Sequence, residues 1–132
     1  MNDVNLWAVL TAAVSSFLLG GLWYSRALFG VMWHREAGGG EKKEGSGHLA
    51  RVFGVSFLFA LIAAFAFAVW LGPKPELRTA LIQGLVAGSC IVATSFGINY
   101  QFASRSVLMW LIDGGYHTAQ FVLFALVLAP WP

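Results

Sequence analysis

Four long apolar stretches constrain the fold of this chain more than any other feature. They cover approximately residues 4–24, 52–71, 79–100 and 107–129, and only the last contains a formally charged residue, Asp113. Each is long enough to cross a bilayer, which takes about 20 helical residues. Lipid offers no partners to backbone N–H and C=O groups, and the strict alternation of barrel strands is absent, so these spans are predicted to be helices. The sequence predicts an all-α fold, an integral membrane four-helix bundle that forms one domain over residues 1–132.

The overall composition supports a lipid environment. Of the 132 residues, 58% are hydrophobic and only 11% are charged, whereas soluble domains carry about 25% charged residues. The single cysteine, Cys90, excludes an internal disulfide and a cysteine-rich metal site. A formal net charge of +2 gives no indication of nucleic-acid binding. The bilayer is therefore the first expected partner, and no metal site is predicted.

The basic residues predict how the spans are oriented. Six lie in the first and third loops against two in the second, and neither end of the chain outside the spans has any. The positive-inside rule then places the first and third loops in the cytoplasm and both termini on the periplasmic or outer side. Aromatic residues at the span ends predict two interfacial belts. The outer belt would contain Trp7, Trp70 and Trp131, and the inner belt Trp23, Tyr24, Trp33, Tyr100 and Trp110.

The first loop, about residues 25–50, has two parts. The segment "RALFGVMWHRE" mixes large apolar and charged side chains, which is typical of a short helix lying in the headgroup region. A cytoplasmic extension of the first helix explains the same residues equally well. The following "GGGEKKEGSG" is predicted to be a polar, glycine-rich linker.

Small residues recur at every fourth position in three of the spans. Such stripes let helix backbones approach closely where lipid removes the hydrophobic driving force. They predict a compact bundle, with self-association through whichever stripe stays free. The positions expected to pack are Ala12, Ser16 and Gly20 in the first span, Ala60 and Ala64 in the second, and Gly84 and Gly88 in the third.

The last span contains a stripe of polar residues. Asp113, His117 and Gln120 are spaced i, i+4, i+7 and so share one helix face, with Tyr116 beside them. An ionised aspartate at the centre of a membrane helix costs about 2.5–3.5 kcal/mol on insertion scales. The stripe is therefore expected to face the bundle interior, enclosed water or a partner subunit. The expected companions are Asn99 and Gln101 near the inner end of the third span, with Ser15, Ser16, Thr94 and Ser95 deeper in.

The chain resembles the DUF1761 family of small bacterial membrane proteins. The resemblance extends over nearly the whole chain in the same four-helix order. It rests on "GGLWYSRALFG" after the first span, Asn99, and "LIDGGYH" in the last span. The chain departs from the family pattern at Arg26, where proline is usual, and at Asp113, where asparagine is usual. The most specific family residues are Leu22, Trp23, Tyr24, Ser25, Leu28, Phe29 and Gly30, followed by Gly115, Tyr116 and His117.

The resemblance implies the fold and a bacterial cytoplasmic (inner) membrane, but no biochemistry. We expect a non-enzymatic structural or accessory component that self-associates or joins a larger membrane complex. The alternative is a small-ion or proton channel or transporter that uses the stripe of Asp113, His117 and Gln120. A third hypothesis makes His117 an axial ligand to haem or a chlorophyll-like pigment, although no cofactor is predicted otherwise. The sequence contains no enzyme motif, and the Asp113–His117 pair has no evident nucleophile beside it, so an enzyme is not expected.

Overall fold

The computed structural model describes residues 4–38 and 46–132 and is entirely helical in its regular elements. The prediction of an all-α fold is confirmed. Most of the glycine-rich linker lies outside the described residues. The elements are α1 (Leu6–Trp23), α2 (Gly30–Glu36), α3 (Ser46–Leu71), α4 (Leu77–Val86), the π-helical segment η1 (Ala87–Val92), α5 (Ala93–Phe102) and α6 (Val107–Leu128).

Four helical segments are long and apolar enough to cross a membrane. They are Leu6–Trp23, Gly47–Leu71, Leu77–Phe102 and Val107–Leu128. The third combines α4, η1 and α5 into one continuous rod. Together these segments mark the chain as a membrane protein.

Local sequence signals explain where the helices begin and end. Asn5 caps α1, its Oδ1 accepting from the backbone N–H groups of Trp7 and Ala8 at 2.9 and 3.1 Å. Ser106 caps α6 in the same way, with its Oγ accepting from the N–H of Met109 at 3.0 Å. Between α3 and α4, Gly72 adopts a positive φ of 79° that favours glycine, and two prolines follow.

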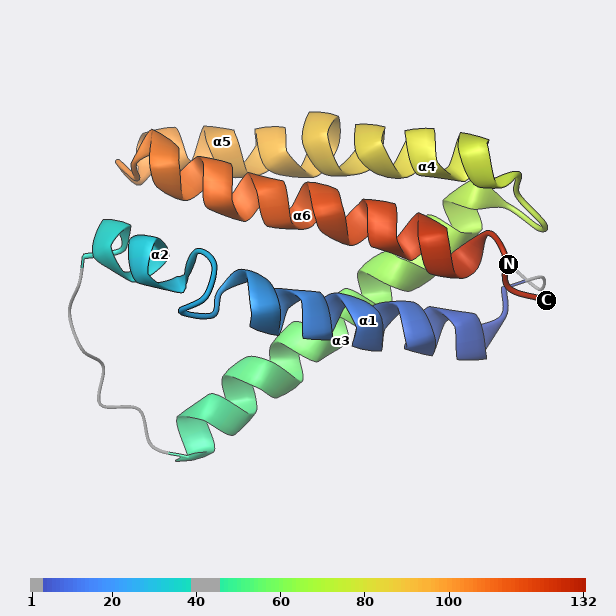
Figure 1. Ribbon diagram of the computed structural model, residues 1–132, viewed down its shortest axis with the longest axis horizontal. Helices are drawn as coiled ribbons and strands as arrows, with labels where there is room; N and C mark the ends of the chain where they lie inside the picture. Colours follow the sequence, from blue (N-terminus) through green and yellow to red (C-terminus); the bar gives the residue numbers. More distant parts are fainter. Residues whose placement is uncertain (1–3, 39–45) are drawn as a thin grey trace.

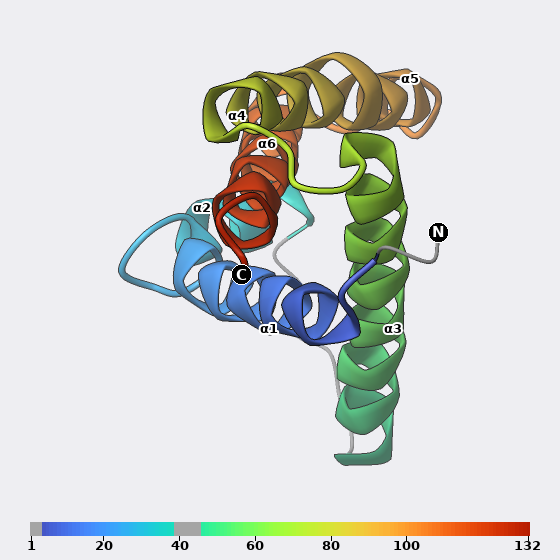
Figure 2. The ribbon, with the colours of Figure 1, turned by 90° about the vertical axis from the view of Figure 1, so that its right-hand side faces the viewer.

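Helix α6 is the centre of the molecule. It lies between α1 on one side and the α4–α5 rod on the other (Figures 1 and 2), and half of its most apolar stretch is buried. Helix α3 crosses α1 obliquely (Figure 1). The start of α1 and the end of α6 lie at one end of the bundle, whereas α2 and the α5–α6 turn lie at the other. We call these the terminal end and the loop end.

The apolar core comes from every membrane-spanning segment. Phe67 of α3 and Phe124 of α6 are its largest side chains, with their ring centroids 6.5 Å apart. Alanines fill the space between them and the neighbouring helices, which permits close backbone approach. The buried cluster consists of Val9, Ala12, Ala64, Phe67, Ala80, Ala87, Phe124 and Ala125.

Two glycines bring the third span directly onto α6. A Cβ atom added at Gly84 would lie 2.6 Å from the carbonyl oxygen of Phe121. One added at Gly88 would lie 2.5 Å from Cα of Thr118. Both distances are far below a van der Waals contact, so any larger residue would push the two backbones apart. The G-x-x-x-G therefore lies in the contact between the third span and α6.

The other small residues expected to pack have different neighbours. Ala12, Ser16, Ala60 and Ala64 are all buried. A Cβ atom at Gly20 would lie 3.3 Å from the hydroxyl oxygen of Tyr116, so α1 passes close to the polar stripe of α6 there.

Candidate functional site

Asp113 joins three helices at the loop end of the bundle. Its side chain is only 7% exposed. Tyr24, the C-cap residue directly after α1, donates its hydroxyl to Oδ1 at 2.5 Å, and Tyr100 of α5 donates to Oδ2. Both carboxylate oxygens are thus engaged by donors from different helices. Burial and the hydrogen bond to Asp113 raise the pKa of Tyr24 above its ordinary range, so its phenol stays protonated and available as a donor.

A second group of polar side chains lies further along α6. Nδ1 of His117 is 2.7 Å from Oε1 of Gln120, and Nε2 of Gln120 is 3.5 Å from Oγ of Ser16 in α1. Because an amide oxygen only accepts, this pairing makes Nδ1 of His117 the protonated ring nitrogen. Tyr116 donates its hydroxyl to the backbone carbonyl of Ser16 at 2.9 Å. Ser16 therefore anchors two residues of the α6 stripe to α1.

Aromatic rings cover the imidazole of His117. Phe96 of α5 stacks on it with centroids 5.0 Å apart and planes inclined by 18°. Tyr116 meets it edge-on, with centroids 4.8 Å apart. No hydrogen bond reaches Nε2 of His117 from residues 4–38 or 46–132. This nitrogen is the one polar atom of the stripe that the described chain leaves available.

Two tryptophans tie α6 to its neighbours through backbone carbonyls. Trp23 of α1 donates its indole N–H to the carbonyl of Ile112 at 2.9 Å. Trp110 of α6 donates to the carbonyl of Ala93 in α5 at 2.7 Å. Glycines make room for both rings: a Cβ at Gly115 would lie 3.1 Å from the Trp23 ring, and one at Gly97 3.2 Å from the Trp110 indole nitrogen.

The family segment from Leu22 to Gly30 forms the turn that delivers Trp23 and Tyr24. The N–H of Phe29 bonds to the carbonyl of Trp23, and that of Gly30 to the carbonyl of Ser25, at 3.0 and 2.9 Å. A Cβ atom at Gly30 would lie 2.2 Å from the carbonyl oxygen of Tyr24, so only glycine fits.

The remaining side chains of this turn divide between packing and surface. Phe29 packs on the Trp23 ring with centroids 5.0 Å apart, whereas Leu22 and Leu28 are exposed. The chain then continues as α2, a separate short helix. The first loop therefore turns sharply after α1 and does not prolong that helix.

The structure brings together most, but not all, of the candidate site residues. Asp113 and Gln120 are buried, while Tyr116 and His117 are half-buried. Asn99 lies exposed on α5 and makes no hydrogen bond through its side chain within the described ranges. Its neighbour Tyr100 takes the expected place opposite Asp113.

Sequence reasoning missed the roles of four residues. The inner aromatic belt is predicted to contain Trp23, Tyr24, Tyr100 and Trp110, yet each of them turns its polar atom inward to α5 or α6. An acid placed near the same membrane level as two tyrosines is the signal that could have indicated the cluster. Among the residues described, no group of three or more histidine, cysteine or acidic side chains is placed to hold a metal ion.

Comparison with known proteins identifies one family. Its model, described as "Protein of unknown function (DUF1761)", matches residues 7–129. That range contains all four membrane-spanning segments except for Leu6 at the start of α1. No curated protein and no solved structure matches the chain.

Proposed function

The chain belongs to the DUF1761 family, and we propose that it is a non-catalytic structural or accessory component of a bacterial inner membrane. In this proposal the polar stripe of α6 holds the protein's own helices together. The outer faces of the bundle are then free to contact lipid, a second copy or another membrane protein.

The observation that supports this proposal most is that both oxygens of Asp113 accept hydrogen bonds. Tyr24 and Tyr100 occupy both of its oxygens from within the same chain. Interhelical hydrogen bonds in membranes contribute only about 0.6 kcal/mol on average. Leaving a buried charged group without its partners costs about 1–3 kcal/mol or more. The three residues therefore stabilise the bundle chiefly as a complete set, which favours a structural role.

The surface of α3 supports an accessory role. Residues 49–62 of α3 present large apolar side chains to the outside, and its membrane segment is the least buried of the four. These side chains are Leu49, Val52, Phe53, Val55, Leu58, Phe59 and Ile62. We propose self-association or entry into a larger complex through this face, because α3 is the span that is covered least by the rest of the chain.

A test of the structural role combines stability with transport. The double variant Asp113→Asn, His117→Ala is compared with Thr94→Val, a control on the exposed side of α5 whose hydroxyl bonds only to its own helix. We expect the double variant to lower the melting temperature in detergent and the control to leave it unchanged. Liposomes containing wild-type protein should move protons no faster than empty liposomes. A proton flux abolished by the double variant at unchanged melting temperature would contradict the proposal.

One observation favours the alternative function of proton or small-ion transport. The polar groups from Asp113 to Gln120 follow α6 for about 10 Å, and Nε2 of His117 has no partner within residues 4–38 and 46–132. Histidine is the side chain best suited to exchange protons near neutral pH. For this alternative, His117→Gln should abolish a pH-driven flux that Thr94→Val preserves.

The third hypothesis, haem or pigment ligation by His117, has its own readout. A ligand would have to reach Nε2 past Phe96 and Tyr116, which cover the ring. Purified protein that carries a visible absorption band, lost in His117→Ala, would support it. A colourless protein that takes up no added haem would leave the structural proposal in place.

A further inference from the structure

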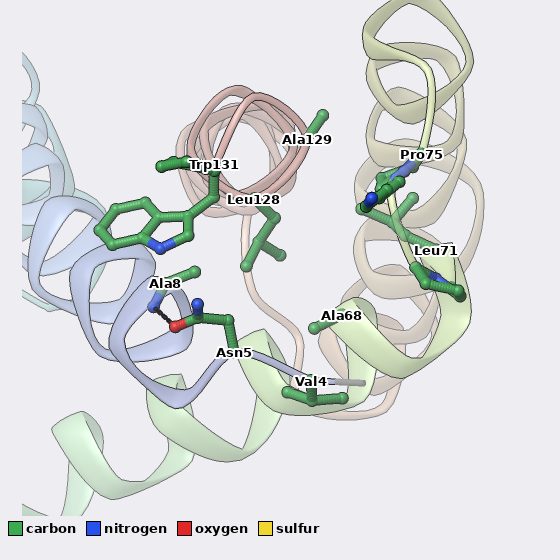
Figure 3. A pocket seen from close by; sticks show the side chains of 13 residues that line it. Val4, Asn5, Ala8, Ala68, Leu71, Pro75, Leu128, Ala129 and Trp131 are labelled. Carbon is green, nitrogen blue, oxygen red and sulfur yellow. Dashed lines mark hydrogen bonds between the residues drawn. The ribbon is translucent and has the colours of Figure 1, made fainter. Parts of the chain in front are cut away.

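A pocket of about 250 Å³ opens at the terminal end of the bundle. Figure 3 shows it between the start of α1 and the ends of α3 and α6. None of the residues that line it belongs to the polar stripe, so it is independent of the function proposed above. The residues that characterise it are Ala8, Ala68, Leu71, Lys74, Leu128 and Trp131.

The wall of the pocket is apolar and comes from three membrane-spanning helices. Ala8, Ala68, Leu71 and Leu128 contribute aliphatic surface, and Trp131 adds an indole. Ligand pockets usually have volumes of about 300–1,000 Å³. A pocket slightly below this range suits a single alkyl chain or one small group, and is too small for a complete two-chain lipid.

The rim of the pocket carries a cation and an amide. Lys74 is exposed and makes no ion pair with any acid in residues 4–38 and 46–132. Its φ of 48° is a left-handed conformation that is costly for a residue with a side chain. The rim amide belongs to Asn5, whose Oδ1 caps α1, so that its NH₂ group can donate to a ligand.

The position of the pocket determines how a ligand would be oriented in it. The apolar spans α1, α3 and α6 begin or end there, and Trp70 is exposed at the same end. Tryptophans mark the level where hydrocarbon meets headgroups. A ligand at this level can place an apolar part against the helices and a charged head beside Lys74.

We propose that this pocket binds one chain of an anionic amphiphile, with its carboxylate or phosphate head beside Lys74. The alkyl chain lies against Leu71 and Leu128. The amide of Asn5 donates a second hydrogen bond to the head. The ligand needs both an alkyl chain and an anionic head, because the wall of the pocket is apolar and Lys74 at its rim is cationic.

The test uses the full chain in vesicles of zwitterionic lipid. A photoactivatable fatty acid is added in trace amounts, in parallel with its methyl ester, which has the same chain and no charge. Mass spectrometry locates the cross-links. We expect the acid to label Leu71 and Leu128 about fivefold more than the ester. This ratio corresponds to the ~1 kcal/mol that one basic residue near a membrane surface contributes to attraction of an anionic group.

Three variants make the result decisive. Lys74→Gln should reduce labelling by the acid to the level of the ester. Arg78→Gln, which removes a charge from the same region without lining the pocket, should change nothing. Ala68→Phe, which fills the pocket, should abolish labelling by both probes. Melting temperatures show whether each variant is folded. If Ala68→Phe does not fold, the comparison of Lys74→Gln with Arg78→Gln still tests the proposal.

Several outcomes would overturn the proposal. One is equal labelling of the pocket by the acid and the ester in wild-type protein. Another is the same loss of labelling in Arg78→Gln as in Lys74→Gln. Labelling spread evenly over exposed positions such as Leu58 and Phe59 of α3 would mean contact with bulk lipid only. Displacement of the acid by inorganic phosphate would assign the site to free anions.

Discussion

Tyr24 donates a hydrogen bond to Asp113 across 89 positions of sequence, at 2.5 Å, while its neighbour Trp23 donates to the carbonyl of Ile112 across the same separation. Two adjacent residues at the end of α1 thus dock in register on two adjacent residues of α6. The turn that follows α1 is closed by Gly30 against the carbonyl of Tyr24. The family segment and the polar stripe are therefore parts of one structure.

Substitution of Gly30 tests the link between this turn and Asp113. In Gly30→Ala the new Cβ would overlap the carbonyl of Tyr24, so the turn must open and Tyr24 must shift. We expect a loss of about 1–3 kcal/mol in the free energy of unfolding, the range for overpacking. Thermal unfolding in detergent measures it. The exposed Leu28 of the same turn provides the control, because Leu28→Ala should change stability by less than about 0.5 kcal/mol.

The contact of the third span with α6 depends on Gly88. In Gly88→Ala the added methyl would press on Cα of Thr118, and the two helices must separate. We expect a loss of about 1–3 kcal/mol. Gly21→Ala is the matched control, since a Cβ there meets nothing within 4 Å. A helical Gly→Ala change in open space should stabilise by about 0.5–1 kcal/mol. Equal effects at the two glycines would contradict the packing described.

The ionisation of Tyr24 follows from its burial and its bond to Asp113. Both raise its pKa, whereas a tyrosine in the unfolded chain titrates near pH 10. Stability from this group is therefore fully present below about pH 10 and decreases as pH rises above it. In a titration of tyrosinate absorbance, Tyr24→Phe should leave the signal between about pH 9 and 11 unchanged. Loss of a tyrosine titrating in that interval would show that Tyr24 is exposed to water.

The sequence predicts the spans well because bilayer thickness sets their length and lipid sets their composition. The i, i+4, i+7 spacing likewise reveals a shared face of α6 without tertiary information. The choice between Asn99 and Tyr100 could not be made in this way. The two are adjacent on α5, Tyr100 half-buried and Asn99 exposed. Polar and apolar side chains are spread around that helix without forming one apolar face, so its pattern does not predict its rotation.

Tyr24 illustrates a second limit of sequence reasoning. An aromatic residue at a helix end is typical of an interfacial belt, and its inward position depends on the turn closed by Gly30. The π-helical segment η1 also changes the rotation of α5 relative to α4. No local pattern in residues 87–92 specifies that change.

The most direct test of the central claim is a double-mutant cycle between Tyr24 and Asp113. Tyr24→Phe, Asp113→Leu and their combination are compared by unfolding in detergent, with Tyr116→Phe replacing Tyr24→Phe as the control, because Tyr116 bonds to Ser16 instead. The account predicts a coupling energy of about 1–3 kcal/mol for Tyr24 with Asp113 and a much smaller one for Tyr116. A coupling for Tyr24 no larger than that for Tyr116 would contradict it.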